Sequence, residues 1–227
     1  MSPATEPTES LKARAYRAIK TRVLTNQLAP GTFVSDQEEA MRLGMSRTPV
    51  REALQLLESD GLVAAEPRRG VRVLSISRAD VREVYEVLTA LEVKAVELIA
   101  ARGLGAEGLA PLDEACEAMS EALDLGVLDR WSEADEAFHR ALLTLSGNRH
   151  LMEAGLRYRD RIQRAHFVAL RLRPEARPRA SLAAHRALVD ALARADGKRA
   201  VDLHARQREG AGRELIGMLD RLNLDAL

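Results

Sequence analysis

The stretch at residues 44–62, GMSRTPVREALQLLESDGL, limits the possible folds more than any other part of the chain. It predicts a helix from about Thr48 to Asp60, with Pro49 in its first turn and Gly61 as its stop, after a preceding helix that stops at Gly44. Its apolar and polar residues fall on opposite faces: Val50, Leu54 and Leu57 on one, Arg47, Arg51 and Gln55 on the other. The apolar face therefore packs on neighbouring elements, and the arginines face solvent.

The segments around this helix complete a supersecondary pattern. An apolar residue at every fourth position predicts a first helix, formed by Leu11, Ala15, Ile19 and Val23. The run SDQE at 35–38 predicts a capping box, in which Ser35 accepts from the amide three residues on and Glu38 reaches back, so a short second helix follows. The β-prone runs at 62–65 and 71–74 predict a hairpin. Three helices and a hairpin are typical of a winged helix-turn-helix fold.

The rest of the chain predicts helix nearly to its end. SRAD at 77–80 is another capping box, and the long helix after it ends at Gly103. Further helices are predicted at 107–124, 129–146, 149–172, 179–195 and 198–223. We therefore predict a mostly α protein: a disordered tail (1–10), a winged helix-turn-helix domain (11–77), and an all-helical bundle of about six helices (78–227).

Composition narrows the class of protein. The formal net charge is zero, so any binding of a polyanion must come from a local patch. Cys116 is the only cysteine, which excludes an intramolecular disulfide and favours a reducing compartment. The first ten residues lack a signal-peptide pattern, and no apolar run reaches membrane-spanning length. We expect a cytoplasmic protein with no membrane partner.

Arg47 and Arg51 point to double-stranded DNA. The amino end of a helix favours a phosphate, and an arginine fork matches the acceptor pair of guanine in the major groove. Ser46 and Thr48 lie beside the arginines, and the turn at 42–46 suits a helix-turn-helix motif. The alternative is a solvated surface. The DNA interpretation requires both guanidinium groups to be exposed and not bound to neighbouring acids.

The predicted hairpin adds a second set of candidates. Arg68 and Arg69 lie at its tip and Gly70 follows, where the backbone can approach a phosphate or enter a minor groove. Taken singly, each of these arginines is more simply explained as an ordinary solvent-exposed surface residue. Together with the helix they favour a DNA-binding surface.

The helical half holds candidate metal ligands. Asp135 and His139 lie four residues apart, so they share a helix face, and His185 and His204 lie on otherwise apolar helices. One carboxylate and up to three imidazoles suit a divalent metal ion such as zinc, nickel, manganese or iron. The alternatives are a surface pair or hydrogen-bonded core histidines.

The sequence resembles the GntR family of transcriptional regulators. SRTPVREAL and the P-x-R-G run of the hairpin carry this resemblance over residues 11–77. It implies that Arg47, Thr48 and Arg51 contact bases or nearby phosphates, that a second-helix contact falls on Gln37, and that the wing contacts fall on Arg69 and Gly70. One departure is Glu39, where the family usually has an apolar residue.

Residues 78–227 resemble the FCD-type effector domain of the FadR-like branch. Asp135, His139 and Asn148 match its D-x-x-x-H…N pattern, and His185 matches its next histidine. The resemblance implies a divalent metal held by one Asp and three His, with an organic-acid effector. The third histidine position falls on Gln207, and His204 lies three residues earlier, so either residue can complete the set.

The effector pocket departs from the family in a second way. The branch often has an arginine four residues before the glutamate of its first effector-domain helix; here the glutamate is Glu92 and that position is Leu88. The adjacent Thr89, together with Gln207, is a candidate effector contact. Either the effector is less acidic than usual, or another arginine holds it. Candidates lie in RYRDRIQRAHFVALRLR at 157–173, Arg161 among them, although most of that run is expected to face solvent.

We expect a homodimeric, ligand-responsive regulator, usually a repressor in this family, on a palindromic operator. Two alternatives stay open. One is a metal-free FadR-like regulator. The other is a metalloenzyme built on Asp135, His139 and His185, which we do not favour because no candidate base or nucleophile adjoins them.

Overall fold

The computed structural model describes residues 9–172, 178–223 and 225–226. The chain forms two compact units that meet between Ser75 and Ile76. Most of the predicted disordered tail lies outside the described residues. Ser10, its last residue, accepts a hydrogen bond from the amide of Ala13 and caps the first helix.

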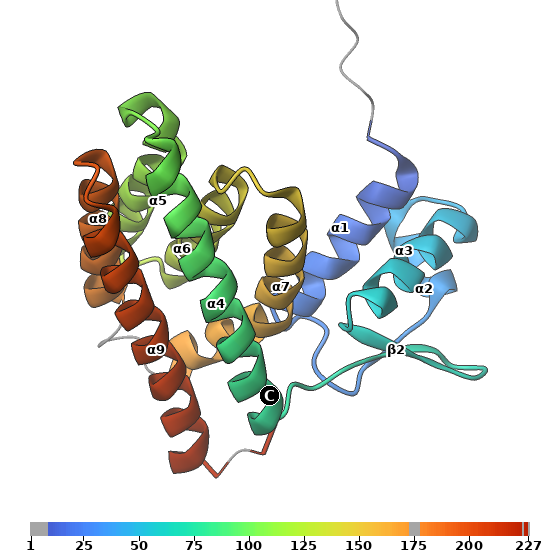
Figure 1. Cartoon of the computed structure of the whole chain (residues 1–227). Helices are drawn as coiled ribbons and strands as arrows, with labels where there is room; N and C mark the ends of the chain where they lie inside the picture. Colours follow the sequence, from blue (N-terminus) through green and yellow to red (C-terminus); the bar gives the residue numbers. More distant parts are fainter. Residues whose placement is uncertain (1–8, 173–177, 224, 227) are drawn as a thin grey trace, which may run out of the picture. The chain divides into compact units, whose positions relative to one another are not determined.

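The first unit contains three helices and a small sheet (Figure 1). The helices are α1 (Leu11–Leu24), α2 (Asp36–Leu43) and α3 (Arg47–Ser59), and the strands are β1 (Phe33–Val34), β2 (Val63–Glu66) and β3 (Gly70–Val73). All strand pairs are antiparallel, in the order β1-β3-β2. The predicted helices and hairpin are present. The two-residue strand β1 was not predicted, because so short a run gives no alternation to detect.

The core of this unit confirms the predicted apolar face of α3 and most of that of α1, where Ala15, Ile19 and Val23 are buried but Leu11 is 52% exposed. Val50, Leu54 and Leu57 are buried with Ile19 and Val23 from α1. The arginines of α3 lie on its opposite, exposed face. Burial of this apolar stripe fixes the rotation of α3 about its axis and hence the direction of its arginines.

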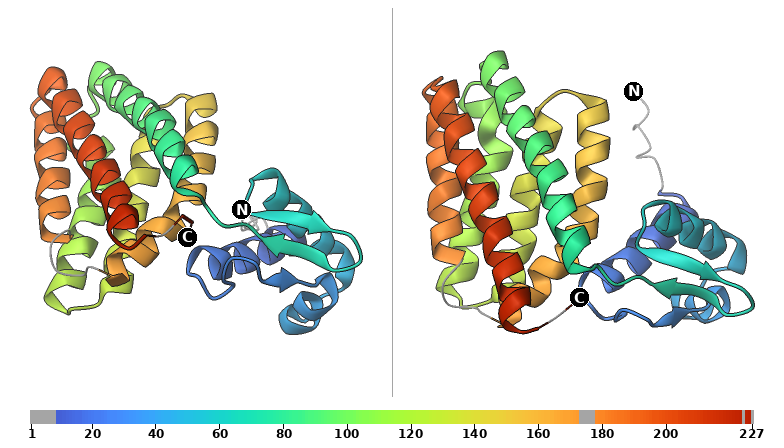
Figure 2. Two further views of the ribbon diagram at one scale, coloured as in Figure 1. Left: turned by 90° about the horizontal axis from the view of Figure 1, so that it is seen from below. Right: turned by 60° about the horizontal axis from the view of Figure 1, so that its bottom comes forward.

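The second unit is a bundle of long helices (Figure 2). In the described chain they are α4 (Arg78–Arg102), α5 (Ala106–Asp124), α6 (Leu128–Leu145), α7 (Arg149–Leu172), α8 (Pro178–Ala193) and α9 (Gly197–Arg221). Their bounds lie within two residues of the predicted ones. Helices α4 and α9 lie side by side in both views. None of the described helices is both long enough and apolar enough to cross a lipid bilayer.

The two predicted capping boxes have different outcomes. The one at 77–80 is confirmed: Ser77 accepts from the amide of Asp80, and the Asp80 carboxylate accepts from the amide of Ser77. At 35–38, Ser35 instead accepts from the amide of Gln37, at 3.2 Å. A cap can bind either the second or the third amide of a helix, and sequence alone does not separate the two.

Candidate nucleic-acid interface and metal centre

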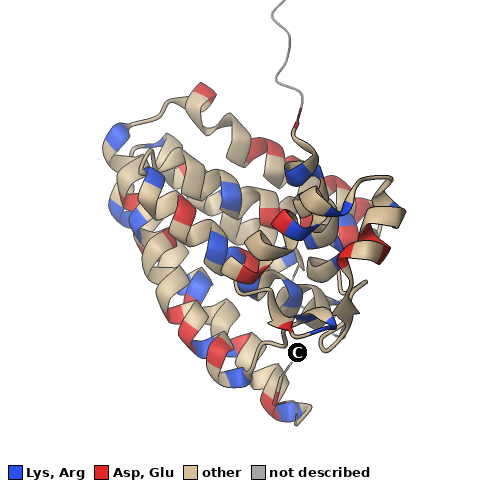
Figure 3. Ribbon diagram, turned by 90° about the vertical axis from the view of Figure 1, so that its right-hand side faces the viewer, with Lys and Arg blue, Asp and Glu red and all other residues tan. Residues whose placement is uncertain are grey.

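A groove of about 680 Å³ runs between the start of α2, the exposed face of α3 and the hairpin. Residues predicted to contact DNA line it: Gln37, Arg47, Arg51, Arg68, Arg69 and Gly70. Ser46 and Thr48 are exposed at the start of α3 but are not part of its lining. Basic and acidic residues are interspersed over the ribbon (Figure 3), and Asp36, Glu58 and Glu66 also line the groove. The groove is therefore not uniformly basic.

Asp36 binds both arginines of α3. Arg47 Nη2 donates to Asp36 Oδ1 at 2.8 Å, and Arg51 Nη2 donates to Asp36 Oδ2 at 3.1 Å. The arginine side chains are 58% and 65% exposed, as expected. The expectation that they are not bound to neighbouring acids is wrong, because the helix-turn-helix brings the first residue of α2 opposite the first turns of α3.

These ion pairs are open to competition. Burial alone would raise the pKa of Asp36, but the hydrogen bonds from Arg47 and Arg51 outweigh it and lower the pKa below its usual value. Exposed pairs of this kind contribute only about 0.2–1 kcal/mol each. A DNA phosphate or a guanine edge can therefore take over one or both guanidinium groups.

The hairpin presents its basic residues in a strained turn. Arg68 has a φ of +65° and Gly70 a φ of +91°. The Arg69 guanidinium lies over the Phe33 ring, 4.3 Å from its centroid. The fold itself requires a glycine at position 70, whether or not the backbone approaches DNA there, because an added Cβ would collide with the carbonyl oxygen of Val34 on β1.

At position 39 the chain has a glutamate where the family usually has an apolar residue, and this glutamate forms a buried ion pair. Its side chain is bound by Arg22 of α1 and by Arg42, whose Nε lies 2.8 Å from the carboxylate. A buried carboxylate is tolerated when it is paired in this way. The departure therefore keeps the contact between α1 and α2 by a different interaction.

The structure brings Asp135, His139 and His185 together. Asp135 and His139 come from α6 and His185 comes from α8. His185 Nε2 lies 3.0 Å from Asp135 Oδ1, and His139 Nε2 lies 3.9 Å from Asp135 Oδ2. Both histidines are buried, and one ligand atom from each of the three residues lies within 4.8 Å of the others. This spacing is compatible with a single divalent ion.

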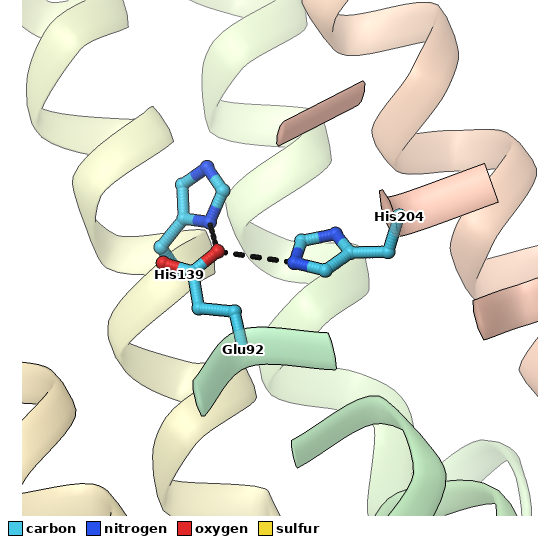
Figure 4. Close-up of side chains that lie close together, drawn as sticks. All are labelled: Glu92, His139 and His204. Atoms are coloured by element: carbon cyan, nitrogen blue, oxygen red, sulfur yellow. Dashed lines mark hydrogen bonds and ion pairs between the residues drawn. The ribbon is translucent and has the colours of Figure 1, made fainter. Parts of the chain in front are cut away.

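Glu92 on α4 fixes the orientation of His139 (Figure 4). Its Oε2 lies 2.9 Å from His139 Nδ1 and 3.0 Å from His204 Nε2. In Figure 4 the second ring nitrogen of His139 points away from Glu92. His204 therefore meets His139 through Glu92, in a second cluster of possible ligands, and not through Asp135.

The charges around Glu92 decide which groups carry protons. Burial alone would raise the pKa of Glu92, but Arg208, His139 and His204 lower it well below its usual value. Burial lowers the pKa of His139 to about 3, so this imidazole is neutral near pH 7. A neutral His139 that donates Nδ1–H to an ionised Glu92 keeps a lone pair on Nε2, on the side of Asp135. Metal-ligating histidines commonly have such a carboxylate behind them.

A small cavity of about 30 Å³ adjoins this cluster. Asp135, His139 and Gln207 line it, together with Trp131, Ser132, His166, Leu170, Ser181 and Arg208. This volume exceeds the roughly 10–15 Å³ that one water molecule needs. Gln207 Oε1 is buried and has no hydrogen-bond partner. A buried oxygen without a partner next to two possible ligands fits a bound ion or ligand.

Two of the predicted effector contacts lie elsewhere. Arg161 pairs with Asp80 at 3.6 Å, and neither Arg161 nor Thr89 lines the cavity. Two fully buried arginines were missed instead: Arg159, which binds Glu136 and Glu92, and Arg208, whose Nε lies 3.2 Å from Glu92. Arg159 lies inside the run at 157–173, most of which was expected to face solvent. Its burial could have been predicted only by combining its position on the inner face of the helix with knowledge of a buried acidic residue on another helix.

Both units match known protein families. Residues 11–73 match the bacterial regulatory proteins of the gntR family, and residues 83–207 match the FCD domain. An HTH-type transcriptional regulator from the TAR-I ttuE-ttuC' intergenic region of Agrobacterium vitis is 44% identical over 131 residues, 57% of this chain and 77% of that protein. The HTH-type transcriptional repressor RspR of Escherichia coli K12 is 32% identical over 140 residues, 62% of this chain and 61% of RspR.

The fold also matches a solved structure. McbR/YncC of Escherichia coli has a TM-score of 0.83 at 24% identity, over 95% of this chain and 100% of that one. The family and these relatives are transcriptional regulators and not enzymes, which removes the metalloenzyme alternative. The chain belongs to the GntR family of transcriptional regulators and carries an FCD domain.

Proposed function

We propose that this regulator is a homodimeric repressor whose helical unit binds a divalent metal ion and a small organic acid. Each subunit offers one copy of α3, so a two-fold dimer suits a palindromic operator. The observation that carries the metal and effector part is the pairing of Glu92 with His139 Nδ1, which leaves Nε2 for a ligand beside Asp135 and His185.

In the DNA-binding unit, Arg47 and Arg51 are the proposed base-reading residues. Ser46 caps α3 but makes no side-chain cap hydrogen bond, so its hydroxyl remains available for a phosphate. Gln37, Thr48, Arg68, Arg69 and Gly70 are the other proposed contacts, from α2, α3 and the hairpin. Contacts to phosphate position the protein, and contacts to bases give its sequence preference.

In the helical unit, Asp135, His139 and His185 are the proposed metal ligands. Gln207, with its unpartnered oxygen, is a better candidate for a fourth ligand than His204, which already binds Glu92. The mixture of nitrogen and carboxylate donors suits zinc, nickel, manganese or iron. When bound, the ion would supply a positive centre for an acidic effector. Ser181 donates to Asp135 and helps to hold its carboxylate in place.

Effector control requires a different affinity for DNA in two states of the protein. An effector that binds one arrangement of the helical units better than another shifts the equilibrium between them, and the same free energy appears in DNA affinity. The alternative regulator, with an effector but no metal, uses the same cavity and differs only in its need for an ion.

Elemental analysis of protein purified without chelator tests the metal proposal. We expect about one divalent ion per chain in the wild type and in Asp129→Ala, an exposed residue on the same helix, and a loss of the ion in Asp135→Ala. A folded wild-type protein that neither contains nor takes up zinc or nickel would support the metal-free alternative. Sedimentation velocity with and without a palindromic fragment tests the dimer and its operator.

A further inference from the structure

The small cavity beside the proposed metal ligands Asp135 and His139 is lined by two residues whose buried N–H donors have no hydrogen-bond partner. Trp131 and Arg208 both line it, from α6 and α9. Trp131 Nε1 and Arg208 Nη2 are buried, and neither has a hydrogen-bond partner. A buried donor without a partner costs roughly 1–3 kcal/mol. Two such donors on one cavity indicate a ligand that accepts from both.

Arg208 is held firmly on its other sides. Its residue is 1% exposed, and its Nε lies at ion-pair distance from Glu92, 3.2 Å, without the alignment of a hydrogen bond. The guanidinium carbon lies 4.8 Å from the centroid of the Tyr85 ring. Gly212 makes room for that ring, because a Cβ there would lie 2.9 Å from Tyr85 Cδ1. The cation is thus fixed by an acid and an aromatic face, and Nη2 remains for a ligand.

The position where the family often has an arginine cannot serve here. Leu88 is fully buried in an apolar cluster with Tyr85 and Leu215. Arg161, the alternative expected from sequence, is bound to Asp80. Among the described residues that line the cavity, Arg208 is the arginine.

We propose that Arg208 and Trp131 bind the carboxylate of a small monocarboxylic acid, as the anion-binding pair of the effector site. Two unpartnered N–H donors from residues that line one cavity match the two oxygens of a carboxylate, and the guanidinium contact is charge-assisted. This inference rests on the proposed effector function and assigns its specificity to α6 and α9.

The charge of the site selects a monoanion. In this ion-pair network the guanidinium groups of Arg140, Arg159 and Arg208 are balanced by the carboxylates of Glu92, Glu136 and Asp160. Asp135 adds one further negative charge, and a divalent ion would add two positive charges. The sum is one positive charge, which one carboxylate neutralises. The cavity volume of about 30 Å³ favours an acid of few carbon atoms.

Trp131 provides the assay, because it is the only tryptophan of the chain. Wild-type protein, with and without added nickel, is titrated with acetate, lactate and pyruvate, and with the neutral analogues acetamide and lactamide. We expect at least one of the acids to change the fluorescence of Trp131 saturably and to raise the Tm, and the amides to do neither. Neutral analogues that bind as tightly as the acids would overturn the inference, as would three acids that all fail to bind.

Single-residue variants distinguish a direct role of Arg208 and Trp131 in binding the carboxylate from a role in packing alone. Arg208→Lys keeps the charge beside Glu92 but loses the outer donor, and we expect at least a tenfold weaker affinity for the acid by calorimetry. Trp131→Phe keeps an aromatic side chain but removes the indole Nε1–H together with part of the ring volume, with a severalfold weaker affinity expected. Arg186→Lys, on the exposed side of α8, is the matched control and should bind as the wild type does. Unchanged affinity in Arg208→Lys, or in Trp131→Phe should Arg208→Lys misfold, refutes the pair.

The same titrations distinguish this inference from the function beneath it. Acid binding that needs Arg208 but not nickel keeps the anion pair and rejects the metal, and with it the charge sum given above. If nickel binding is lost in Asp135→Ala but the affinity for the acids is unchanged in Arg208→Lys, the metal site is supported and the Arg208–Trp131 anion-binding pair is rejected.

Discussion

Replacing Asp36 by asparagine should increase the affinity of the protein for DNA of any sequence while reducing its preference for the operator. The carboxylate binds Arg47 and Arg51 with 2.8 and 3.1 Å contacts and lies in the groove where phosphates are expected. Its removal frees two guanidinium groups and deletes one negative charge. The freed arginines also lose the acid that holds both of them in one orientation.

The magnitude follows from the exposure of the two pairs. The arginine side chains are 58% and 65% exposed, so each pair is worth about 0.2–1 kcal/mol after screening by solvent. Breaking both to bind DNA therefore costs about 0.4–2 kcal/mol, and Asp36→Asn should tighten binding to non-operator DNA by about 2- to 30-fold. Operator binding should tighten less, because the loss of preorganisation opposes the gain.

Fluorescence anisotropy at several salt concentrations, with an operator fragment and a scrambled fragment, measures both quantities. Glu38→Gln is the matched control, since it removes one charge from the exposed face of the same helix and lies outside the groove. A specificity ratio that rises in Asp36→Asn, or non-operator affinity that does not change relative to Glu38→Gln, would refute the view that Asp36 competes with DNA.

Three further predictions concern single side chains. Arg51→Ala should weaken operator binding by ~1–3 kcal/mol and relax base preference, as measured by anisotropy on a set of single-base operator variants; unchanged affinity would reject it as a base-reading residue. Glu92→Gln leaves the buried guanidinium of Arg208 without its acid and Arg159 with only Glu136, and urea unfolding at pH 7 should show a loss of about 3–5 kcal/mol. Because the pKa of Glu92 is lowered in the folded state, this stabilisation is present above the unfolded pKa of about 4.3 and is lost as pH falls through the folded value, so wild type and Glu92→Gln should converge only in strong acid. Gly70→Ala should destabilise the DNA-binding unit by about 1–3 kcal/mol, seen as a lower Tm, since alanine is strained at a φ of +91° and would press on Val34; an unchanged Tm would contradict this.

Helix positions and faces were predictable because each depends on nearby residues. Ser77 with Asp80, and the glycines at 44 and 103, act within one turn of the helix they delimit, so they are visible in sequence. The proposed metal ligands Asp135 and His139 share a face for the same local reason. Their proximity to His185 had to come from the family resemblance, because it depends on how α6 and α8 both pack on α5.

The buried charges were not predictable in this way. Arg159 looks like its exposed neighbour Arg157 until Glu136 and Glu92 are placed beside it by two other helices. The same holds for the ion pairs of Asp36 with Arg47 and Arg51 and of Glu39 with Arg22, whose partners lie 11 to 17 residues apart in the chain. A charged residue is assigned to the surface by default, and only tertiary packing corrects that assignment.

Glu92 touches residues of three other helices, namely His139 on α6, Arg159 on α7, and His204 and Arg208 on α9. It stands on α4, which runs without interruption for 25 residues and begins at Arg78, directly after the residues that leave the DNA-binding unit. About four turns of helix separate Glu92 from that start. A change of ligand that tilts α4 at Glu92 would therefore also move the point where the DNA-binding unit is attached.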